Sequence, residues 1–352
     1  MRWFEAIVGH SRAKEILGRA IERDRVPPAL LVTGRDGVGR CTVATELAKA
    51  VMCRGPAPSS GGDVRPCGNC VPCNKIAAGT HPDFVRVELD EGKSEISIAQ
   101  VRALLDELAL APVEARRRVF VIDRAELMND FAQDALLKSL EEPPARALLI
   151  LIARHESALL RTIQSRCFLL ALGELETSDV ERVLVAKGVE AGEARTRAAW
   201  SGGSPGVGLR ERHPERIAAA RALVDALVSG EARRNPLAVA ADLVARAAAK
   251  NLEPSVRREG ALDVTDLLGR VLRDALASAT DPGARLLSGA DPKSVARLAQ
   301  AGADRVATAI DSVQKVEESI ANNQNVNLAL EGLVLDVSAA ICLAQEAAVA
   351  RR

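Results

Sequence analysis

The chain has 352 residues, more than a single hydrophobic core usually holds, so more than one domain is expected. Hydrophobic residues make up 48% and charged residues 27%, a globular balance that excludes a mainly disordered chain. Lysine plus arginine and aspartate plus glutamate both number 47, which excludes a protein that neutralises many nucleic-acid phosphates by its own net charge.

No apolar segment of the sequence is long enough to cross a membrane. The strongest apolar run, residues 147–153, is far shorter than the roughly 20 residues that a spanning helix needs. Residues 1–5 lack the apolar core of a signal peptide. We therefore expect a cytoplasmic protein with no membrane partner.

Strand and helix patterns alternate in the first half of the chain. Amphipathic or helical patterns lie at residues 7–21, 42–51, 98–109 and 127–141. Apolar runs that predict strands lie at residues 29–32, 118–123, 147–152 and 167–170. Strands that alternate with helices form a parallel sheet with helices on its faces, so residues 1–172 are expected to be an α/β domain.

The strand patterns stop after this region. Residues 173–212 are expected to form a small helical domain, which contains a run of glycine, serine and proline at 201–206. Residues 213–352 are expected to form a larger all-helical domain. Breaks in it are expected near Pro254, Pro282 and Pro292, because proline cannot continue a helix.

A glycine-rich turn lies between the first predicted strand and the helix that follows it. Its residues are Gly34, Arg35, Asp36, Gly37, Val38, Gly39, Arg40, Cys41 and Thr42. Such a turn presents backbone N–H groups to phosphate, and the helix N-terminus favours the anion. An active phosphate loop has a lysine and then a serine or threonine where this chain has Arg40 and Cys41.

These substitutions remove the chemistry of the loop and keep its glycines. The planar guanidinium of Arg40 does not replace a lysine ammonium, and the Cys41 thiol is a poor ligand for magnesium. Thr42 comes one residue too late. Asp123 could hold magnesium, but Arg124 stands where a catalytic acid would follow. We predict a degenerate nucleotide site that binds ATP weakly or not at all, with an unrelated strand–turn–helix as the alternative.

Four cysteines follow this helix in a short segment, residues 53–73. Cys67, Cys70 and Cys73 lie within seven residues, and Cys53 lies fourteen positions before Cys67. In a cytoplasmic protein this spacing favours metal thiolate over disulfide, and four thiolates with no open position are typical of structural zinc. An iron–sulfur cluster and plain reduced thiols are the alternatives.

Together with the loop and the cysteines, three further motifs resemble the bacterial clamp-loader family of AAA+ proteins. They are residues 80–83 (Thr-His-Pro-Asp), 98–102 and 134–144, of which the last is the most specific. The resemblance extends from Phe4 to about Gly206, and the remainder is similar to the family's collar domain. It implies an α/β AAA+ P-loop domain at 1–172 with a zinc module at 53–73, a helical lid at 173–212 and an all-α collar at 213–352.

The resemblance also implies a function. Clamp loaders of this family are arcs of five related subunits that use ATP to open a sliding clamp and place it on primed DNA. The implied partners are gamma/tau and delta subunits, the sliding clamp, and primed DNA through the assembly. The family's zinc module corresponds to Cys53, Cys67, Cys70 and Cys73, although the gap after Cys53 is longer here.

A Ser-Arg-Cys motif of the family matches Ser165, Arg166 and Cys167. In the family this arginine reaches the neighbouring subunit's ATP site, which implies that Arg166 is an arginine finger acting in trans. An ordinary surface cation is the alternative. Arg154 and the segment 204–206 stand where motor subunits have groups that sense nucleotide. These departures fit a stator subunit without intrinsic ATPase activity.

Two other functions stay open at this point. The first is an ATP-hydrolysing motor subunit of gamma/tau type, against which the phosphate loop argues. The second is a zinc-bearing AAA+-like adaptor outside replication, which would have no use for Arg166.

Overall fold

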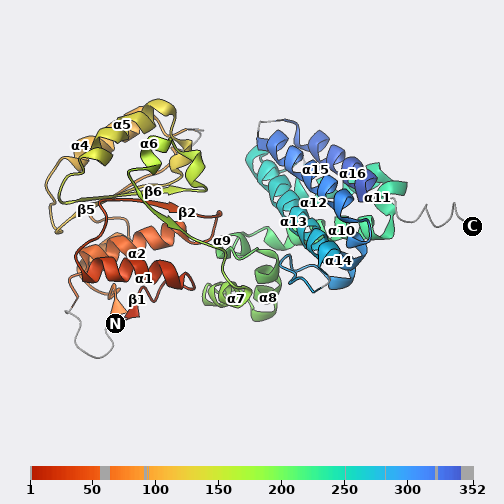
Figure 1. The fold of residues 1–352 in the computed structure, drawn as a ribbon, viewed down its shortest axis with the longest axis horizontal. Helices are drawn as coiled ribbons and strands as arrows, with labels where there is room; N and C mark the ends of the chain where they lie inside the picture. The colour runs from red at the N-terminus through yellow and green to blue at the C-terminus, as the bar shows by residue number, and fades with distance from the viewer. Residues whose placement is uncertain are drawn as a thin grey trace, which may run out of the picture. The chain divides into compact units, whose positions relative to one another are not determined.

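The computed structural model describes residues 2–55, 64–90, 93, 95–249, 251–281, 283–321 and 324–341. The chain folds into two compact units, residues 1–183 with 203–206 and residues 184–202 with 207–352. Both are drawn in Figure 1. The division into three domains expected from the sequence stays a prediction.

A five-stranded parallel sheet forms the centre of the first unit. Its strands are β2 (Ala29–Thr33), β4 (Phe84–Val87), β5 (Arg118–Ile122), β6 (Ala147–Ala153) and β7 (Phe168–Ala171). They lie in the order β4-β5-β6-β2-β7, and every neighbouring pair is parallel. The predicted parallel sheet is confirmed, with β4 as a strand that the sequence patterns did not predict. A separate short pair joins β1 (Arg2–Trp3) to β3 (Val64–Arg65).

Helices cover both faces of this sheet. The helices of this unit are α1 (Ser11–Glu22), α2 (Arg40–Met52), α3 (Val71–Ala77), α4 (Ile98–Leu108), α5 (Asp130–Glu141), α6 (Arg161–Gln164) and α7 (Thr177–Ala186), which ends in the second unit, with 3-10 turns at Ala125–Leu127 and Glu156–Ala158. Figure 1 shows α1 and α2 on one face and α4 and α5 on the other. Successive strand residues point to opposite faces, so Leu30 and Leu31 belong to two different cores.

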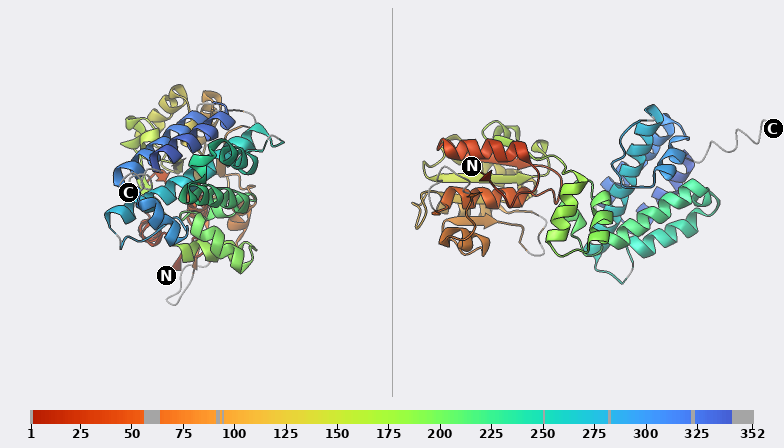
Figure 2. Two further views of the ribbon diagram at one scale, coloured as in Figure 1. Left: turned by 90° about the vertical axis from the view of Figure 1, so that its right-hand side faces the viewer. Right: turned by 90° about the horizontal axis from the view of Figure 1, so that it is seen from below.

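The described residues of the second unit form helices joined by turns and loops, with no strand among them. Its helices are α8 (Ala191–Trp200), α9 (Pro205–Gly208, which begins in the first unit), α10 (His213–Ser229), α11 (Glu231–Arg234), α12 (Pro236–Ala247), α13 (Pro254–Thr280), α14 (Pro292–Ala299), α15 (Ala303–Ala321) and α16 (Val326–Ile341). Pro254 and Pro292 each start a helix, where proline's missing N–H costs nothing. Figure 2 shows these helices from two further sides. No described helix has the length and apolar character needed to span a bilayer.

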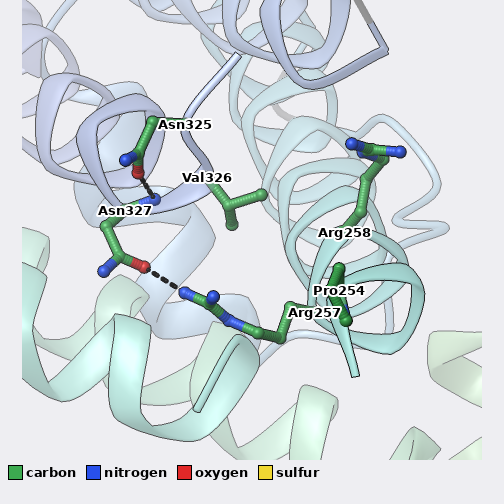
Figure 3. Close-up of a pocket in the computed structure, with 6 residues that line it drawn as sticks. All are labelled: Pro254, Arg257, Arg258, Asn325, Val326 and Asn327. Atoms are coloured by element: carbon green, nitrogen blue, oxygen red, sulfur yellow. Dashed lines mark hydrogen bonds between the residues drawn. The ribbon is translucent and has the colours of Figure 1, made fainter. Parts of the chain in front are cut away.

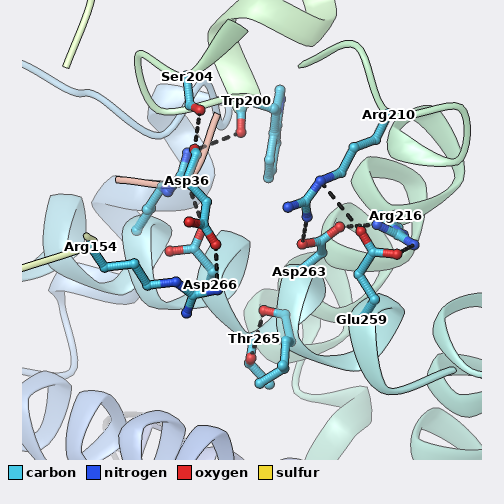
Figure 4. A network of polar contacts seen from close by, with 12 residues as sticks. Asp36, Arg154, Trp200, Ser204, Arg210, Arg216, Glu259, Asp263, Thr265 and Asp266 are labelled. Atoms are coloured by element: carbon cyan, nitrogen blue, oxygen red, sulfur yellow. Dashed lines mark hydrogen bonds and ion pairs between the residues drawn. The ribbon is translucent and has the colours of Figure 1, made fainter. Parts of the chain in front are cut away.

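A network of ion pairs joins α10 to α13 inside the second unit. Asp263 accepts hydrogen bonds from Arg210 and from the buried Arg216, and Glu259 lies beside both arginines (Figure 4). One turn further along α13, Arg270 pairs with Asp266 and donates to the backbone oxygen of Trp200 at 3.2 Å. Because buried charges are costly unless paired, these contacts fix the packing of α8 and α10 on α13.

His213 is the first residue of α10 and is completely buried. Burial lowers the pKa of His213 to about 4, and the guanidinium groups of Arg197, Arg270 and Arg210 act in the same direction. The imidazole is therefore neutral in the folded chain at neutral pH, because its charged form would be both desolvated and repelled.

This burial predicts a specific loss of stability in mild acid. The unfolded chain protonates His213 below about pH 6.5, whereas the folded chain protonates it only near pH 4. The group should therefore reduce the free energy of unfolding by about 2 kcal/mol between pH 7.5 and pH 5. We expect His213→Gln to remove this part of the pH dependence in urea unfolding followed by Trp200 fluorescence in a Trp3→Phe background. Exposed His155→Gln should keep it, and an unchanged pH dependence in His213→Gln would contradict the assignment.

Candidate functional site

The glycine-rich loop joins β2 to α2, as predicted. Gly34, Gly37 and Gly39 have φ angles of 147°, 74° and 112°, a region that side chains with a Cβ rarely adopt. A Cβ on Gly34 would also lie 2.6 Å from the backbone oxygen of Leu172. The loop therefore requires these glycines for its shape, whatever it binds.

Arg40, in the lysine position of the loop, is turned back onto the loop itself. Its Nη2 donates to Asp36 Oδ1 at 2.6 Å, and the residue is only 8% exposed. Arg154, which follows β6, pairs with the other carboxylate oxygen of Asp36 (Figure 4). The carboxylate of Asp36 is thus paired with two guanidinium groups, and Arg40 is engaged in a contact within its own loop.

The segment 203–206 packs against the same loop. The Ser204 hydroxyl donates to the backbone oxygen of Asp36, as Figure 4 shows, and the Gly206 N–H donates to the backbone oxygen of Gly37 at 2.8 Å. A Cβ on Gly206 would lie 2.6 Å from Gly37 Cα, so the approach depends on glycine. These contacts fix the loop in one conformation.

The carboxylate of Asp123, the residue that follows β5, also binds other side chains. Arg86 on β4 forms an ion pair with Asp123 Oδ2 at 2.5 Å, and the Cys41 thiol donates to the same oxygen at 3.3 Å. Burial, followed by the nearby Asp123 carboxylate, raises the pKa of Cys41 to about 11, so the thiol stays protonated at neutral pH. Thr42 is exposed on α2. The carboxylate expected to hold magnesium therefore already has a cationic partner, Arg86, which the sequence analysis missed because β4 was not predicted.

The four predicted metal ligands lie together. The sulfur atoms of Cys53, Cys67, Cys70 and Cys73 all lie within 4.8 Å of one another, and the Cys70 and Cys53 sulfurs are 3.9 Å apart. A tetrahedral zinc thiolate with bonds of about 2.3 Å places its sulfurs about 3.8 Å apart, so the cluster has nearly the right size. A Cβ on Gly55 would lie 2.9 Å from the Cys67 sulfur, which accounts for a glycine there.

Three of the four cysteines lie at the ends of two helices. Cys53 follows α2, Cys70 precedes α3, and Cys73 lies in the first turn of α3. Burial acts to raise the pKa of Cys70, but hydrogen bonds from the backbone of Cys73 and Arg54 outweigh it and lower the pKa to about 6. The arrangement therefore offers four soft ligands, one of which is stabilised as a thiolate without a metal.

Arg166 lies on the surface between α6 and β7, apart from the loop. Its Nη2 pairs with Glu141 at 2.7 Å, and its Nη1 donates to the backbone oxygen of Thr162 at 2.9 Å and to Ser165 Oγ at 3.3 Å. Cys167 packs against the core beneath α4 and α5, and burial raises its pKa to about 11. Among the described contacts of Arg166, none is with the glycine-rich loop.

Residues 9–176 match the family described as DNA polymerase III, delta subunit. Over these residues the chain is similar to that family. The DNA polymerase III subunit delta' of Bacillus subtilis is 34% identical over 196 residues, which cover 56% of this chain and 57% of that protein. The DNA polymerase III subunit tau of Salmonella typhimurium is 31% identical over 181 residues, covering 51% of this chain and 27% of that protein.

A solved structure is also similar to this chain. A DNA polymerase III gamma subunit-related protein of Thermotoga maritima aligns with a TM-score of 0.47 and 19% identity, covering 92% of this chain and 98% of that one. The matched part of this chain spans little more than half of the delta' relative and about a quarter of the tau relative.

The Thr-His-Pro-Asp motif that contributed to the family resemblance has a structural role here. The Asp83 carboxylate is fully buried and accepts the backbone N–H groups of Val113, Glu114 and Ala115 at 2.8, 2.7 and 2.7 Å. Burial acts to raise the pKa of Asp83, but these hydrogen bonds outweigh it and hold the pKa below its usual value. Glu114 in turn binds Lys75 of α3 at 2.7 Å, which connects this loop to the cysteine module.

Asp83→Asn should therefore destabilise the first unit. An amide cannot accept three N–H groups as strongly as a buried carboxylate, and its own donors would lack partners, so we expect a loss of about 2 to 4 kcal/mol. Urea denaturation at neutral pH measures the change. The exposed Asp106→Asn serves as the control and should stay within about 0.5 kcal/mol of wild type. Equal stability of the two variants would contradict this role of Asp83.

A pocket of about 420 Å³ lies in the second unit, where α13 and α16 begin (Figure 3). It is lined by Pro254, Arg257, Arg258, Asn325, Val326 and Asn327. Arg257 donates to Asn327 Oδ1 at 2.8 Å, and Asn325 Oδ1 accepts the Asn327 N–H at 3.0 Å. The N-terminus of α16 is thus capped by Asn325 and tied to α13 through Arg257.

Proposed function

We propose that this chain is a non-hydrolysing stator subunit of a DNA polymerase III clamp loader, of the delta' type. In this role it helps to load the sliding clamp onto primed DNA and supplies Arg166 to the ATP site of a neighbouring subunit. One observation carries the proposal: charged side chains at the catalytic positions of the nucleotide site are paired with other residues of the same unit. Arg40 binds Asp36, and Asp123 is paired with Arg86.

The proposal includes a finer description of the fold. Residues 1–172 would be an AAA+ nucleotide-binding domain without catalysis, 173–212 a helical lid, and 213–352 a collar that joins it to gamma/tau and delta subunits in the cytoplasm. Contact with primed DNA would occur through the assembly. The balanced charge of the chain supports this limited role in DNA binding.

Exposed apolar residues on α16 support the proposed collar. Leu328 is 67% and Leu335 is 45% exposed, and Gly332 and Ala339 continue the same line at helical spacing. Large apolar side chains and small residues on one helix face suit packing against another helix. We infer that this face contacts a neighbouring subunit.

We also propose that Cys53, Cys67, Cys70 and Cys73 hold a structural zinc ion. The distances among their sulfurs, within 4.8 Å, support four thiolate ligands with no open position. When bound, zinc would cross-link the end of α2 to the start of α3. It would stabilise this module and take no part in nucleotide chemistry.

The zinc proposal predicts one zinc ion per purified chain by elemental analysis. Cys73→Ser should lose most of the metal, because Cys73 is the most buried of the four cysteines and is held in the first turn of α3. Removal of zinc by a chelator should lower the melting temperature. Cys167→Ser, in the same chain but outside the cluster, should keep full zinc content. Iron together with visible absorption would instead indicate an iron–sulfur cluster.

The stator proposal predicts no ATP turnover by the chain alone and stimulated turnover when it is mixed with a gamma/tau-type subunit and a delta subunit. Arg166→Ala should reduce the stimulated rate by about 1000-fold or to background, the scale known for arginine fingers. Arg161→Ala, an exposed arginine of the neighbouring α6, is the matched control and should have no effect.

The same assay separates the alternatives. Robust turnover by the chain alone would favour a gamma/tau-type motor subunit, a possibility kept open by the identity with the tau relative. If the chain binds the other loader subunits but Arg166→Ala does not change their ATPase rate, the result would favour an adaptor, which has the fold of an ATPase and binds partners without acting on ATP.

A further inference from the structure

The guanidinium of Arg166 is held by three acceptors on its own chain. Glu141, Thr162 and Ser165 take hydrogen bonds from its two terminal nitrogens, and no described contact uses its Nε–H. We propose that Glu141 is a positioning residue, which orients Arg166 so that Nε and the adjacent edge of the guanidinium face the neighbouring ATP site. This inference rests on the proposed function of Arg166.

The two side chains come from elements that are locked together. Glu141 is the last residue of α5, and Arg166 follows α6. Gln133 on α5 is buried, and its Oε1 accepts the Leu160 N–H, at the start of α6, at 2.9 Å. Its Nε2 donates to the backbone oxygen of Met128 at 3.1 Å. Because α5 and α6 are fixed to each other, the Glu141 carboxylate has a defined place from which to orient the guanidinium.

The pair is better suited to orientation than to folding stability. Its side chains are 34% and 52% exposed, and ion pairs with such exposure contribute little to stability. A free arginine side chain samples many rotamers, whereas stabilisation of a transferring phosphoryl group needs a guanidinium at a definite place. Three contacts from one rigid surface restrict those rotamers before the neighbouring subunit binds.

The chain contains a matched control for this carboxylate. Glu142 is the next residue, is also exposed, and forms no ion pair within the described part of the chain. Its charge is adjacent to that of Glu141 in the sequence, but it lacks the contact with Arg166 that Glu141 makes. A comparison of the two residues therefore separates the contact from the general effect of negative charge on this surface.

The test is the ATPase rate of the reconstituted loader, measured against increasing concentrations of the full chain. Glu141→Ala should lower the maximal rate about tenfold and leave the half-maximal concentration of the chain unchanged, because orientation and not assembly is impaired. Glu141→Gln, which can still accept a hydrogen bond, should recover part of the loss, and Glu142→Gln should match wild type. The melting temperature of all variants should stay unchanged.

Combination with Arg166→Ala completes the test. Glu141→Ala should have no further effect in that background, since the residue acts only through Arg166. An unchanged or increased maximal rate in Glu141→Ala, or a loss caused only by weaker assembly, would overturn the positioning role while Arg166→Ala still abolishes stimulation. No effect of Arg166→Ala itself would overturn the proposed function, and the positioning role with it.

Discussion

Two carboxylates of the glycine-rich site, Asp36 and Asp123, form ion pairs with arginines of the same unit. These pairs determine which side chains of the site are available to a ligand. Arg40 and Arg154 bind Asp36, and Arg86 binds Asp123. A working nucleotide site keeps its cations for phosphate and its carboxylate for magnesium. Here Arg40, Asp36 and Asp123 each already have a partner within the same unit.

A site whose charged groups are paired internally suits the proposed stator, a subunit that does not change conformation with nucleotide. Contacts of Ser204 and Gly206 hold the loop in one conformation, and the cysteine module is connected to the rest of the unit through Lys75, Glu114 and Asp83. On the surface, Arg166 is held in a defined place by Glu141. In the proposed loader, nucleotide-dependent motion would belong to the neighbours, while this chain presents a rigid surface to one of them.

Local patterns predicted much of this arrangement. The strands β2, β5 and β6 are continuous apolar runs, which is why they could be assigned. The cysteine cluster could be predicted because three of its four ligands lie within seven residues of sequence. Strand β4 could not be assigned, because it has four residues, is partly exposed and contains a charged residue. Helix α5 starts at Asp130 and not at 127, since Arg124 adopts a left-handed conformation that starts a 3-10 turn first.

Pairings between distant residues were beyond the reach of the sequence. Arg86 and Asp123 are 37 positions apart and meet only because β4 and β5 are neighbours in the sheet. Glu141 and Arg166 are 25 positions apart and meet through the packing of α5 on α6. The substitutions at Arg40 and Cys41 predicted that catalysis is lost, but only the fold identifies what has replaced the missing contacts.

The most direct test of the account is a titration of the isolated chain with a fluorescent ATP analogue in the presence of magnesium. Because the groups of the site are paired internally, the account predicts no saturable binding below millimolar concentrations and no effect of magnesium. Magnesium-dependent binding at micromolar concentrations would contradict it, since Asp123 and Arg40 would then have to leave their partners for the nucleotide.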